Sequence, residues 1–236
     1  MRTEISYMRF YVDVSGPTGA LPWKYVHGVA HAVVYSLISD QAPALATHLH
    51  DTGWQHSSLR PVGISPPVFL GAPKRHNAYM MSPNGRIWFG SPIPVLAASL
   101  LAGVTSRREL QWGPVTLTVK GAQLEPMAGP ESSTVLETRS PILVKAGENR
   151  YLLPDDDGYV AALLANIRHK ADLLGLPGDA SLEVLSAGPR RRYDVSGGIR
   201  IGATAKVRLD ADPRLIGALR EWGLGLSTIQ GFGWVR

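Results

Sequence analysis

Cysteine is absent from the 236 residues of this chain. That absence excludes disulfides, thiolate nucleophiles and cysteine-ligated zinc. No apolar run approaches the roughly 18 residues that a membrane-spanning helix needs. The N-terminal stretch MRTEISYMRFYVDV alternates in polarity, whereas a signal peptide carries a continuous apolar block. We therefore expect a cytoplasmic protein with no membrane partner.

Carboxylates are scarce in the segment where the histidines gather. Between residues 27 and 56 the only acidic residues are Asp40 and Asp51. Histidine is the commonest metal ligand and the side chain that titrates nearest to neutral pH. This segment is therefore a metal site, an acid–base site or an accident of composition. Five of the seven histidines lie in it: His27, His31, His48, His50 and His56.

The composition is that of a folded protein, with 44% hydrophobic and 18% charged residues. A net charge of +5 favours an anionic partner. Basic residues are densest between residues 186 and 208, where Asp194 is the only acid, and a solvated surface is the alternative interpretation. The basic residues of this stretch are Arg190, Arg191, Arg192, Arg200, Lys206 and Arg208.

The first half of the chain predicts alternating strands and helices. Residues 4–14 are rich in β-formers and predict a strand. Residues 23–39 predict a helix, and a short helix should follow and end at Gly53. Residues 55–70 predict an irregular strand, after which a strand, a helix and a strand complete the half. The order is that of a βαββαβ unit.

A stretch rich in Pro, Gly and Ser at residues 126–133 predicts a linker. A second series of the same kind follows it, including a strand at residues 197–211 and a helix with Asp212 as its N-cap. We expect an α+β fold of two tandem ferredoxin-like domains, residues 1–128 and 129–236. A bare four-stranded sheet is a common platform for single-stranded RNA.

Four glycines close to the C-terminus form a G-x-G-x5-G-x-G pattern. Successive backbone N–H groups can form a concavity that binds a phosphate. The pattern lacks the lysine of a Walker loop, and too few residues follow it for a dinucleotide-binding unit. A tight connection between a helix and a strand remains the alternative. The glycines are Gly223, Gly225, Gly231 and Gly233.

The ending GLGLSTIQGFGWV resembles the signature loop of the repeat-associated (RAMP) superfamily of CRISPR proteins. Three further stretches, LPWKYVHGVAHAVVYSLIS, LATHLHDTGWQ and SPILVK with YLLPDD and ANIRHK, resemble one family within it. That family is the CRISPR-associated endoribonucleases that process precursor guide RNA, the Cas-six family. The resemblance runs in order along nearly the whole chain.

The histidines allow two kinds of chemistry. His27, His31 and Tyr35 are spaced to share one face of a helix. His-x-x-x-His resembles a zinc pair, but the glutamate of a metalloprotease motif is missing, and magnesium prefers oxygen ligands that this segment lacks. RNA supplies its own nucleophile, the 2′-hydroxyl, so histidine acid–base catalysis is sufficient. We therefore expect no metal and no cofactor.

The resemblance implies roles for particular residues. The general-base histidine of the family matches His50 in LHDTG, and a tyrosine of its first helix matches Tyr35. The family pattern often carries a lysine soon after the histidine, and here His56 stands near that place, with His31 as a substitute candidate. For the RNA backbone we expect the four glycines together with Arg190, Arg191, Arg192, Arg200, Lys145 and Arg168.

The expected function is metal-independent cleavage of CRISPR repeat RNA, leaving a 2′,3′-cyclic phosphate and a 5′-hydroxyl. The expected partners are the repeat RNA and other CRISPR-associated proteins of an interference complex, with a homodimer as an open alternative. Two other functions also remain open. One is a non-catalytic member that only binds and positions guide RNA, and the other is a metal-dependent phosphohydrolase.

Overall fold

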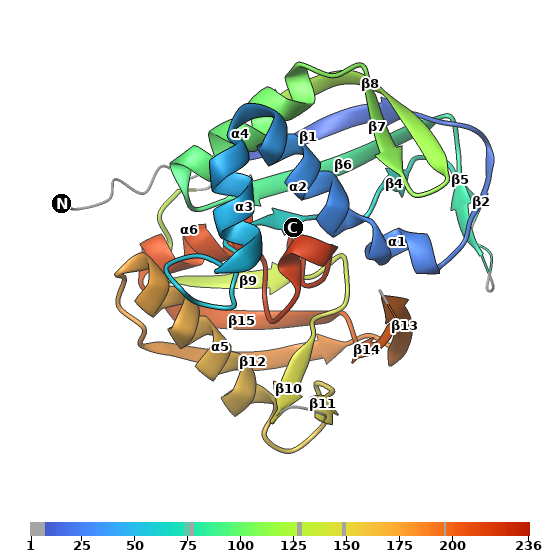
Figure 1. The fold of residues 1–236 in the computed structure, drawn as a ribbon. Coiled ribbons are helices and arrows are strands. Elements are labelled where there is room, and N and C mark those ends of the chain that lie inside the picture. The colour runs from blue at the N-terminus through green and yellow to red at the C-terminus, as the bar shows by residue number, and fades with distance from the viewer. Residues whose placement is uncertain (1–7, 74, 76–77, 127–128, 148–149, 196) are drawn as a thin grey trace.

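The computed structural model describes residues 8–73, 75, 78–126, 129–147, 150–195 and 197–236. Two antiparallel sheets lie one above the other, each with helices against it (Figure 1). The expected α+β fold of two ferredoxin-like domains is confirmed. The boundary between residues 128 and 129 remains a prediction, and residues 127 and 128 lie outside the described residues.

The upper sheet in Figure 1 belongs to the first half of the chain and follows the order β3-β6-β1-β8-β7, with β4 also paired to β6. The strand β1 is central and lies between β6 and β8, as the first strand of a ferredoxin-like unit does. Phe10 and Phe89 stack in its core with ring centroids 5.3 Å apart. The strands are β1 (Met8–Ser15), β3 (Gly63–Ile64), β4 (Val68–Phe69), β6 (Asn84–Ser91), β7 (Glu109–Trp112) and β8 (Val115–Leu124).

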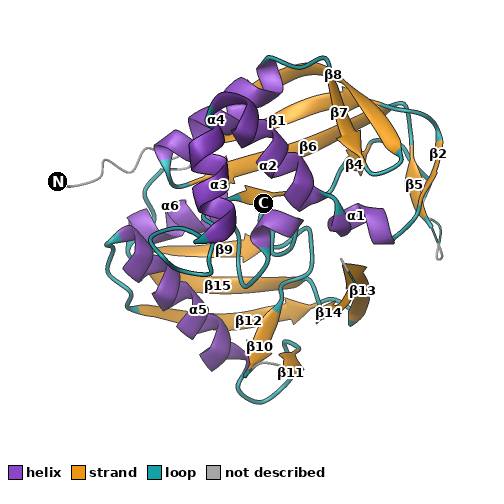
Figure 2. Cartoon of the chain, in the orientation of Figure 1, coloured by secondary structure: helices purple, strands orange, loops and turns teal. Residues whose placement is uncertain are grey.

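Helices cover one face of this sheet (Figure 2). The backbones of α2 and α4 approach closely, since a Cβ on Gly103 would lie 2.4 Å from the Leu37 carbonyl oxygen. The helices are α1 (Lys24–Gly28), α2 (Ala30–Gln41), α3 (Pro43–Asp51) and α4 (Pro94–Thr105). The short helix expected before Gly53 is α3. The single helix expected over residues 23–39 is wrong, because the chain divides it at Val29, next to Gly28, a poor helix former.

The lower sheet has the order β12-β15-β9. A ferredoxin-like sheet would have a fourth strand beside β9. In its place the structure has an isolated antiparallel bridge between Thr138 and Val235. The predicted cap is confirmed, because the Asp212 carboxylate accepts the Arg214 N–H at 2.9 Å. The elements are β9 (Ser133–Glu137), β12 (Ala180–Ala187), β15 (Ala205–Ala211), α5 (Tyr159–Leu174) and α6 (Pro213–Trp222).

The strand expected over residues 197–211 is wrong, because the chain makes two strands there in different sheets. β14 (Gly198–Gly202) pairs with β13 (Arg191–Val195), and β15 follows in the main sheet. At Gly202 a Cβ would lie 2.4 Å from the Ile142 carbonyl oxygen, so the chain passes too close for a side chain. Four further short elements are β2 (Gly19–Leu21), β5 (Tyr79–Met81), β10 (Val144–Ala146) and β11 (Arg150–Leu152).

The C-terminal segment ties the two sheets together. A Cβ on Gly63 or Gly90 would lie 2.3 or 2.6 Å from the Glu221 carbonyl oxygen, so α6 rests directly on β3 and β6. Trp222 Nε1 donates to the Arg60 carbonyl at 2.7 Å. Beyond α6 lies the short 3-10 helix η1 (Thr228–Gln230), which contacts α2 and β3. Within the described part of the chain, no helix combines the length and apolarity needed to cross a membrane.

Candidate active site

Three of the predicted side chains meet where α2 and α3 pack together. His31 and Tyr35 lie one turn apart on α2, with ring centroids 4.5 Å apart. His50, in the last turn of α3, brings its ring within 5.3 Å of Tyr35 and 6.1 Å of His31. Because α3 folds back on α2, a residue 15 positions after Tyr35 returns to its side. We call His31, Tyr35 and His50 the candidate catalytic cluster.

The protonation of the His50 ring follows from its partner. Its Nδ1 lies 2.8 Å from Oδ1 of Asp51, and an ionised carboxylate can only accept a hydrogen bond. Nδ1 therefore carries the proton and donates, which leaves the Nε2 lone pair available as a base. Both side chains are 62% exposed, so the pair is open to a ligand. Asp51 is a residue whose role the sequence pattern did not indicate.

Arg60 is the cation beside the cluster, and the sequence did not indicate it because the family pattern has a lysine after the histidine. Its guanidinium donates to the His50 carbonyl oxygen at 2.8 Å. It also lies against the Tyr35 hydroxyl. Burial raises the pKa of Tyr35, and the hydrogen bond and charge of Arg60 oppose that shift. Burial also lowers the pKa of His31, with smaller contributions from His50 and Arg60.

His56 does not join the candidate catalytic cluster. Its ring lies 6.3 Å from His48, and none of the ring contacts between described residues links it to Tyr35 or His50. Gln55 and His56 both have positive φ angles, which turn the chain away after Gly53. In the sequence, His56 stands near the position of the family's lysine, but this turn separates its ring from Tyr35 and His50.

His27 has a packing role. The side chain is buried, and its ring stacks on Phe232 with centroids 4.1 Å apart. Its Nδ1 lies 3.2 Å from the Gln230 carbonyl oxygen. Burial lowers the pKa of His27 to about 4, so the ring is neutral at pH 7. Within the described chain, no three histidine or acidic side chains are grouped as a metal site would need.

A cavity of about 440 Å³ lies beside the cluster and extends to the second half of the chain. His31 and Arg60 form part of its wall, and the loop from Gly225 to Gln230 forms another part. No aspartate or glutamate is among the described residues that line it. Four basic side chains do line it: Arg60, Lys145, Lys170 and Arg200.

Three of the four glycines form a tight connection after α6, which was the alternative to a phosphate-binding loop. The N–H groups of Gly223, Gly231 and Gly233 donate to carbonyl oxygens of the protein, and a Cβ on Gly233 would lie 1.8 Å from the Leu224 carbonyl oxygen. These three amides are not available to a phosphate. Of the four glycines, Gly225 lines the cavity.

The predicted basic residues divide into two groups. Arg200 on β14 and Lys145 on β10 line the cavity, and the Lys145 ammonium lies 5.0 Å from the Tyr151 ring centroid. The others are exposed and are not among the lining residues. These are Arg190, Arg191 and Arg192, at the start of the β13–β14 hairpin, and Arg168 on α5.

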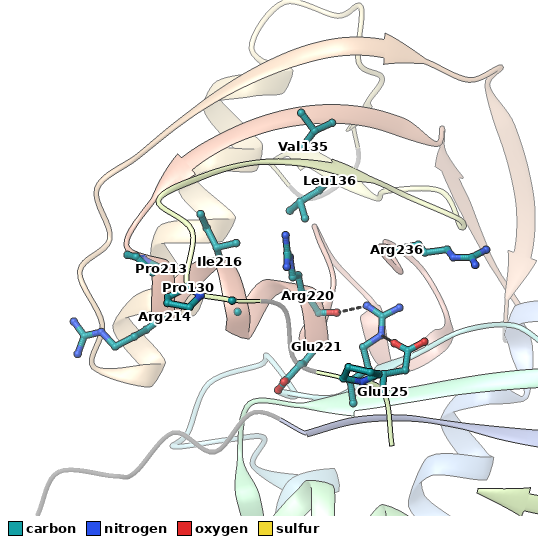
Figure 3. A pocket seen from close by; sticks show the side chains of 14 residues that line it. Glu125, Pro130, Val135, Leu136, Pro213, Arg214, Ile216, Arg220, Glu221 and Arg236 are labelled. Carbon is teal, nitrogen blue, oxygen red and sulfur yellow. Dashed lines mark hydrogen bonds and ion pairs between the residues drawn. The ribbon is translucent and has the colours of Figure 1, made fainter. Parts of the chain in front are cut away.

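A second cavity, of about 420 Å³, contrasts with the first (Figure 3). Figure 3 shows Arg220, Glu221 and Glu125 around it. Four arginines line it, and three of them are in ion pairs: Arg9 with Glu125, Arg214 with Asp212 and Arg220 with Glu131. Burial raises the pKa of Glu221 to about 9, so this carboxyl is neutral at pH 7. The first cavity therefore has the stronger attraction for an anion.

Aromatic side chains lie on the sheet surface of the first half, on β1 and β6. The Arg86 guanidinium carbon lies 3.9 Å from the Tyr11 ring centroid and 5.7 Å from that of Trp88. Trp88 also lines a third cavity, of about 370 Å³, together with Trp23 and Tyr193. Rings on neighbouring strands, with arginine beside them, form the kind of surface on which RNA bases stack.

Comparisons with solved structures show the fold of the whole chain. A solved structure titled as a Cas6-related gene from Pyrococcus furiosus superposes with a TM-score of 0.83 at 17% identity, covering 98% of each chain. One titled as CRISPR associated protein Cas6 gives 0.79 at 21%, covering 98% of this chain and 99% of the other. A third, titled as a RAMP protein binding different RNA substrates, gives 0.81 at 19%, covering 97% and 98%.

A comparison with curated proteins found no match. The sequence itself matches a family model, described as CRISPR associated protein Cas6, C-terminal, over residues 125–236. The matched residues include α5, α6 and the glycine pattern. Residues 125–236 are therefore similar to the C-terminal part of the Cas6 family of CRISPR-associated proteins.

Proposed function

We propose that this protein is a metal-independent endoribonuclease that cleaves CRISPR repeat RNA to give guide RNA. The observation that carries the proposal is the candidate catalytic cluster with Arg60 beside it, because His31 and Arg60 lie at the wall of a cavity lined by basic side chains. The match of residues 125–236 to the Cas6 family supports the same substrate class, as does the likeness to a solved structure of a RAMP protein that binds different RNA substrates.

In the proposed reaction the 2′-oxygen displaces the 5′-oxygen from phosphorus. One proton leaves the 2′-hydroxyl, and one proton is added to the departing 5′-oxygen. Nε2 of His50 takes the proton of the 2′-hydroxyl, and the 2′-oxygen forms a bond to the adjacent phosphorus. The bond from phosphorus to the 5′-oxygen breaks, and that oxygen takes up a proton. The products are a 2′,3′-cyclic phosphate and a 5′-hydroxyl. Asp51 orients the imidazole and stabilises its positive charge after proton transfer.

Arg60 and Tyr35 serve the charge that develops on the phosphate and the leaving oxygen. A guanidinium stays charged at all working pH values and stabilises the added negative charge. Because burial raises the pKa of Tyr35, its hydroxyl stays protonated and can donate to the leaving 5′-oxygen. Burial and the nearby cations keep His31 neutral, so we assign it to packing and hydrogen bonding beside His50.

The RNA strand is proposed to follow the basic residues away from the cluster. Lys145 and Arg200 inside the cavity hold phosphates close to the cut. Arg190, Arg191, Arg192 and Arg168 are proposed as outer contacts. The rings of Tyr11 and Trp88 offer stacking for bases elsewhere on the strand. Phosphate contacts position the RNA, and base contacts select its sequence.

The non-catalytic alternative, a member that binds guide RNA only, is not favoured by a specific observation. Binding alone does not need a histidine held by a carboxylate beside an arginine and a tyrosine. Other CRISPR-associated proteins and a second copy of this chain remain proposed partners of the product-bound form.

The test is to incubate the purified protein with repeat RNA in excess EDTA, with and without a 2′-deoxy substitution at the cut. We expect cleavage of the all-ribose strand and none of the substituted strand, because the nucleophile is missing. Cleavage of the 2′-deoxy strand, or loss of all cleavage in EDTA, would contradict the mechanism. Tight binding without cleavage of either strand would support the non-catalytic alternative.

A further inference from the structure

Lys170 is a buried lysine that none of the steps above uses. It lies on α5 and its side chain is fully buried. Its ammonium donates to the Gly223 carbonyl oxygen at 2.7 Å and lies 4.8 Å from the Trp222 ring centroid. An ammonium has three N–H donors, and a single hydrogen bond accounts for one of them. Among the described residues, no ion pair includes Lys170.

The surroundings of Lys170 lack the negative charge that a buried ammonium normally requires. It lines the cavity of about 440 Å³, and the titratable and charged groups that share the cavity are His31, Arg60, Lys145, Tyr151 and Arg200. Apart from Tyr151, all of these are basic, and none is a carboxylate. Burial lowers the pKa of Lys170 to about 7, whereas a nearby anion would favour the charged form.

We propose that the part of the cavity above Lys170 is a binding subsite for one phosphate group of the RNA strand. Lys145 and Arg200 contact the phosphate directly, and Lys170 supports it from below as the buried positive charge. The same ammonium fixes the Gly223 carbonyl and with it the start of the C-terminal loop, so Lys170 is a positioning residue. The identity of the anion as RNA rests on the proposed function.

The subsite couples binding to proton uptake. Without an anion, burial lowers the pKa of Lys170 to about 7, so the lysine loses its proton as the pH rises above that value. A bound phosphate raises the pKa of the lysine, so at pH 8 binding takes up a proton. Affinity therefore falls as pH rises above 7. His31 has a lowered pKa and is neutral at pH 8, so it does not supply this effect.

The experiment measures the heat of binding at pH 8 in two buffers of different ionisation enthalpy, which gives the protons taken up. The ligands are a 2′-deoxy repeat RNA that is not cleaved and inorganic sulfate, a tetrahedral dianion that does not titrate in this range. The variants are Lys170→Met and, as a matched control, Lys120→Met at an exposed position on β8.

For the wild-type protein and Lys120→Met we expect proton uptake with both ligands. Lys170→Met should lose the uptake, bind RNA about 10-fold more weakly, and show a salt slope shallower by about 0.7. A wild-type protein that takes up no proton with either ligand overturns the proposal, and this arm needs no variant to fold. Unchanged uptake in Lys170→Met also overturns it.

The outcomes separate this inference from the proposed function. If the wild-type protein takes up a proton with sulfate and RNA but never cleaves all-ribose RNA, the subsite stands and the nuclease assignment fails. If cleavage occurs without proton uptake on binding, the nuclease assignment stands and Lys170 only supports the fold. In that case Lys170→Met lowers thermal stability and leaves the salt slope unchanged.

Discussion

The two ends of the histidine-rich segment, at His27 and His50, place the same side chain in opposite surroundings. His27 is 3% exposed, and its ring stacks on Phe232 and meets the edge of Tyr193. His50 is 62% exposed and holds a carboxylate on one nitrogen, with an arginine and a tyrosine close by. Burial thus gives His27 a packing role, whereas the neighbouring carboxylate, arginine and tyrosine make His50 a candidate base.

Replacing His50 should give the largest effect on activity. We expect His50→Ala to slow cleavage of repeat RNA by about 10³-fold, since a positioned base contributes in that range. RNA affinity should change less than about 2-fold, because the ring is assigned to proton transfer and its removal takes away no phosphate contact. His48→Ala, at an exposed position two residues earlier on α3, is the matched control. Equal loss of binding and cleavage would show that His50 binds RNA or supports the fold.

Replacing Arg60 should give the next largest effect. Arg60→Met should slow cleavage by about 10²-fold, because it removes the cation beside the developing charge. Arg60→Lys should recover part of that rate. Single-turnover rates measured from pH 6 to 9 are the readout, with Arg108→Met at an exposed site as the control. An unchanged rate in Arg60→Met would remove Arg60 from the mechanism.

At His27 the change should appear in stability. The ring is neutral in the folded protein with a pKa of about 4, whereas in the unfolded chain it protonates near 6.5. The unfolded state therefore binds more protons between these values, and stability falls as pH drops from 6.5 to 4, by about 3 kcal/mol from this residue. Urea unfolding at pH 7 and pH 4.5 measures it.

The His27→Leu variant should lose most of that pH dependence, since leucine fills the site and does not titrate. His48→Leu should keep the dependence, because that ring is exposed. If the wild-type protein and His27→Leu lose stability in parallel on acidification, the buried imidazole is not the group responsible.

The smallest effect is expected at His56. Its ring lies beside His48, so His56→Asn should change the cleavage rate less than about 3-fold, and asparagine tolerates the positive φ angle there. A loss comparable to that of Arg60→Met would mean that the loop after Gly53 rearranges when RNA binds. The sequence-based assignment of His56 as the cation would then be restored.

Local patterns in the sequence predicted what depends on local forces. Spacing placed His31 beside Tyr35, and Gly53 and Asp212 marked the helix ends that the structure has. The position of Arg60 depends instead on a contact 162 residues away, from Trp222 to its carbonyl oxygen, which no local pattern contains. The four closely spaced glycines look alike in the sequence. In the structure, the amides of Gly223, Gly231 and Gly233 donate to carbonyl oxygens of the protein, and these contacts set them apart from Gly225.

That distant contact also has a consequence for synthesis. A ribosome completes α2, α3 and Arg60 long before it reaches Trp222, so the emerging chain carries its histidines without the support that orients the arginine. The cavity between the halves is complete only after α6 and the residues up to Gln230 have left the exit tunnel. Under the proposed function, a nascent chain bearing the three rings is therefore not yet competent to cleave RNA.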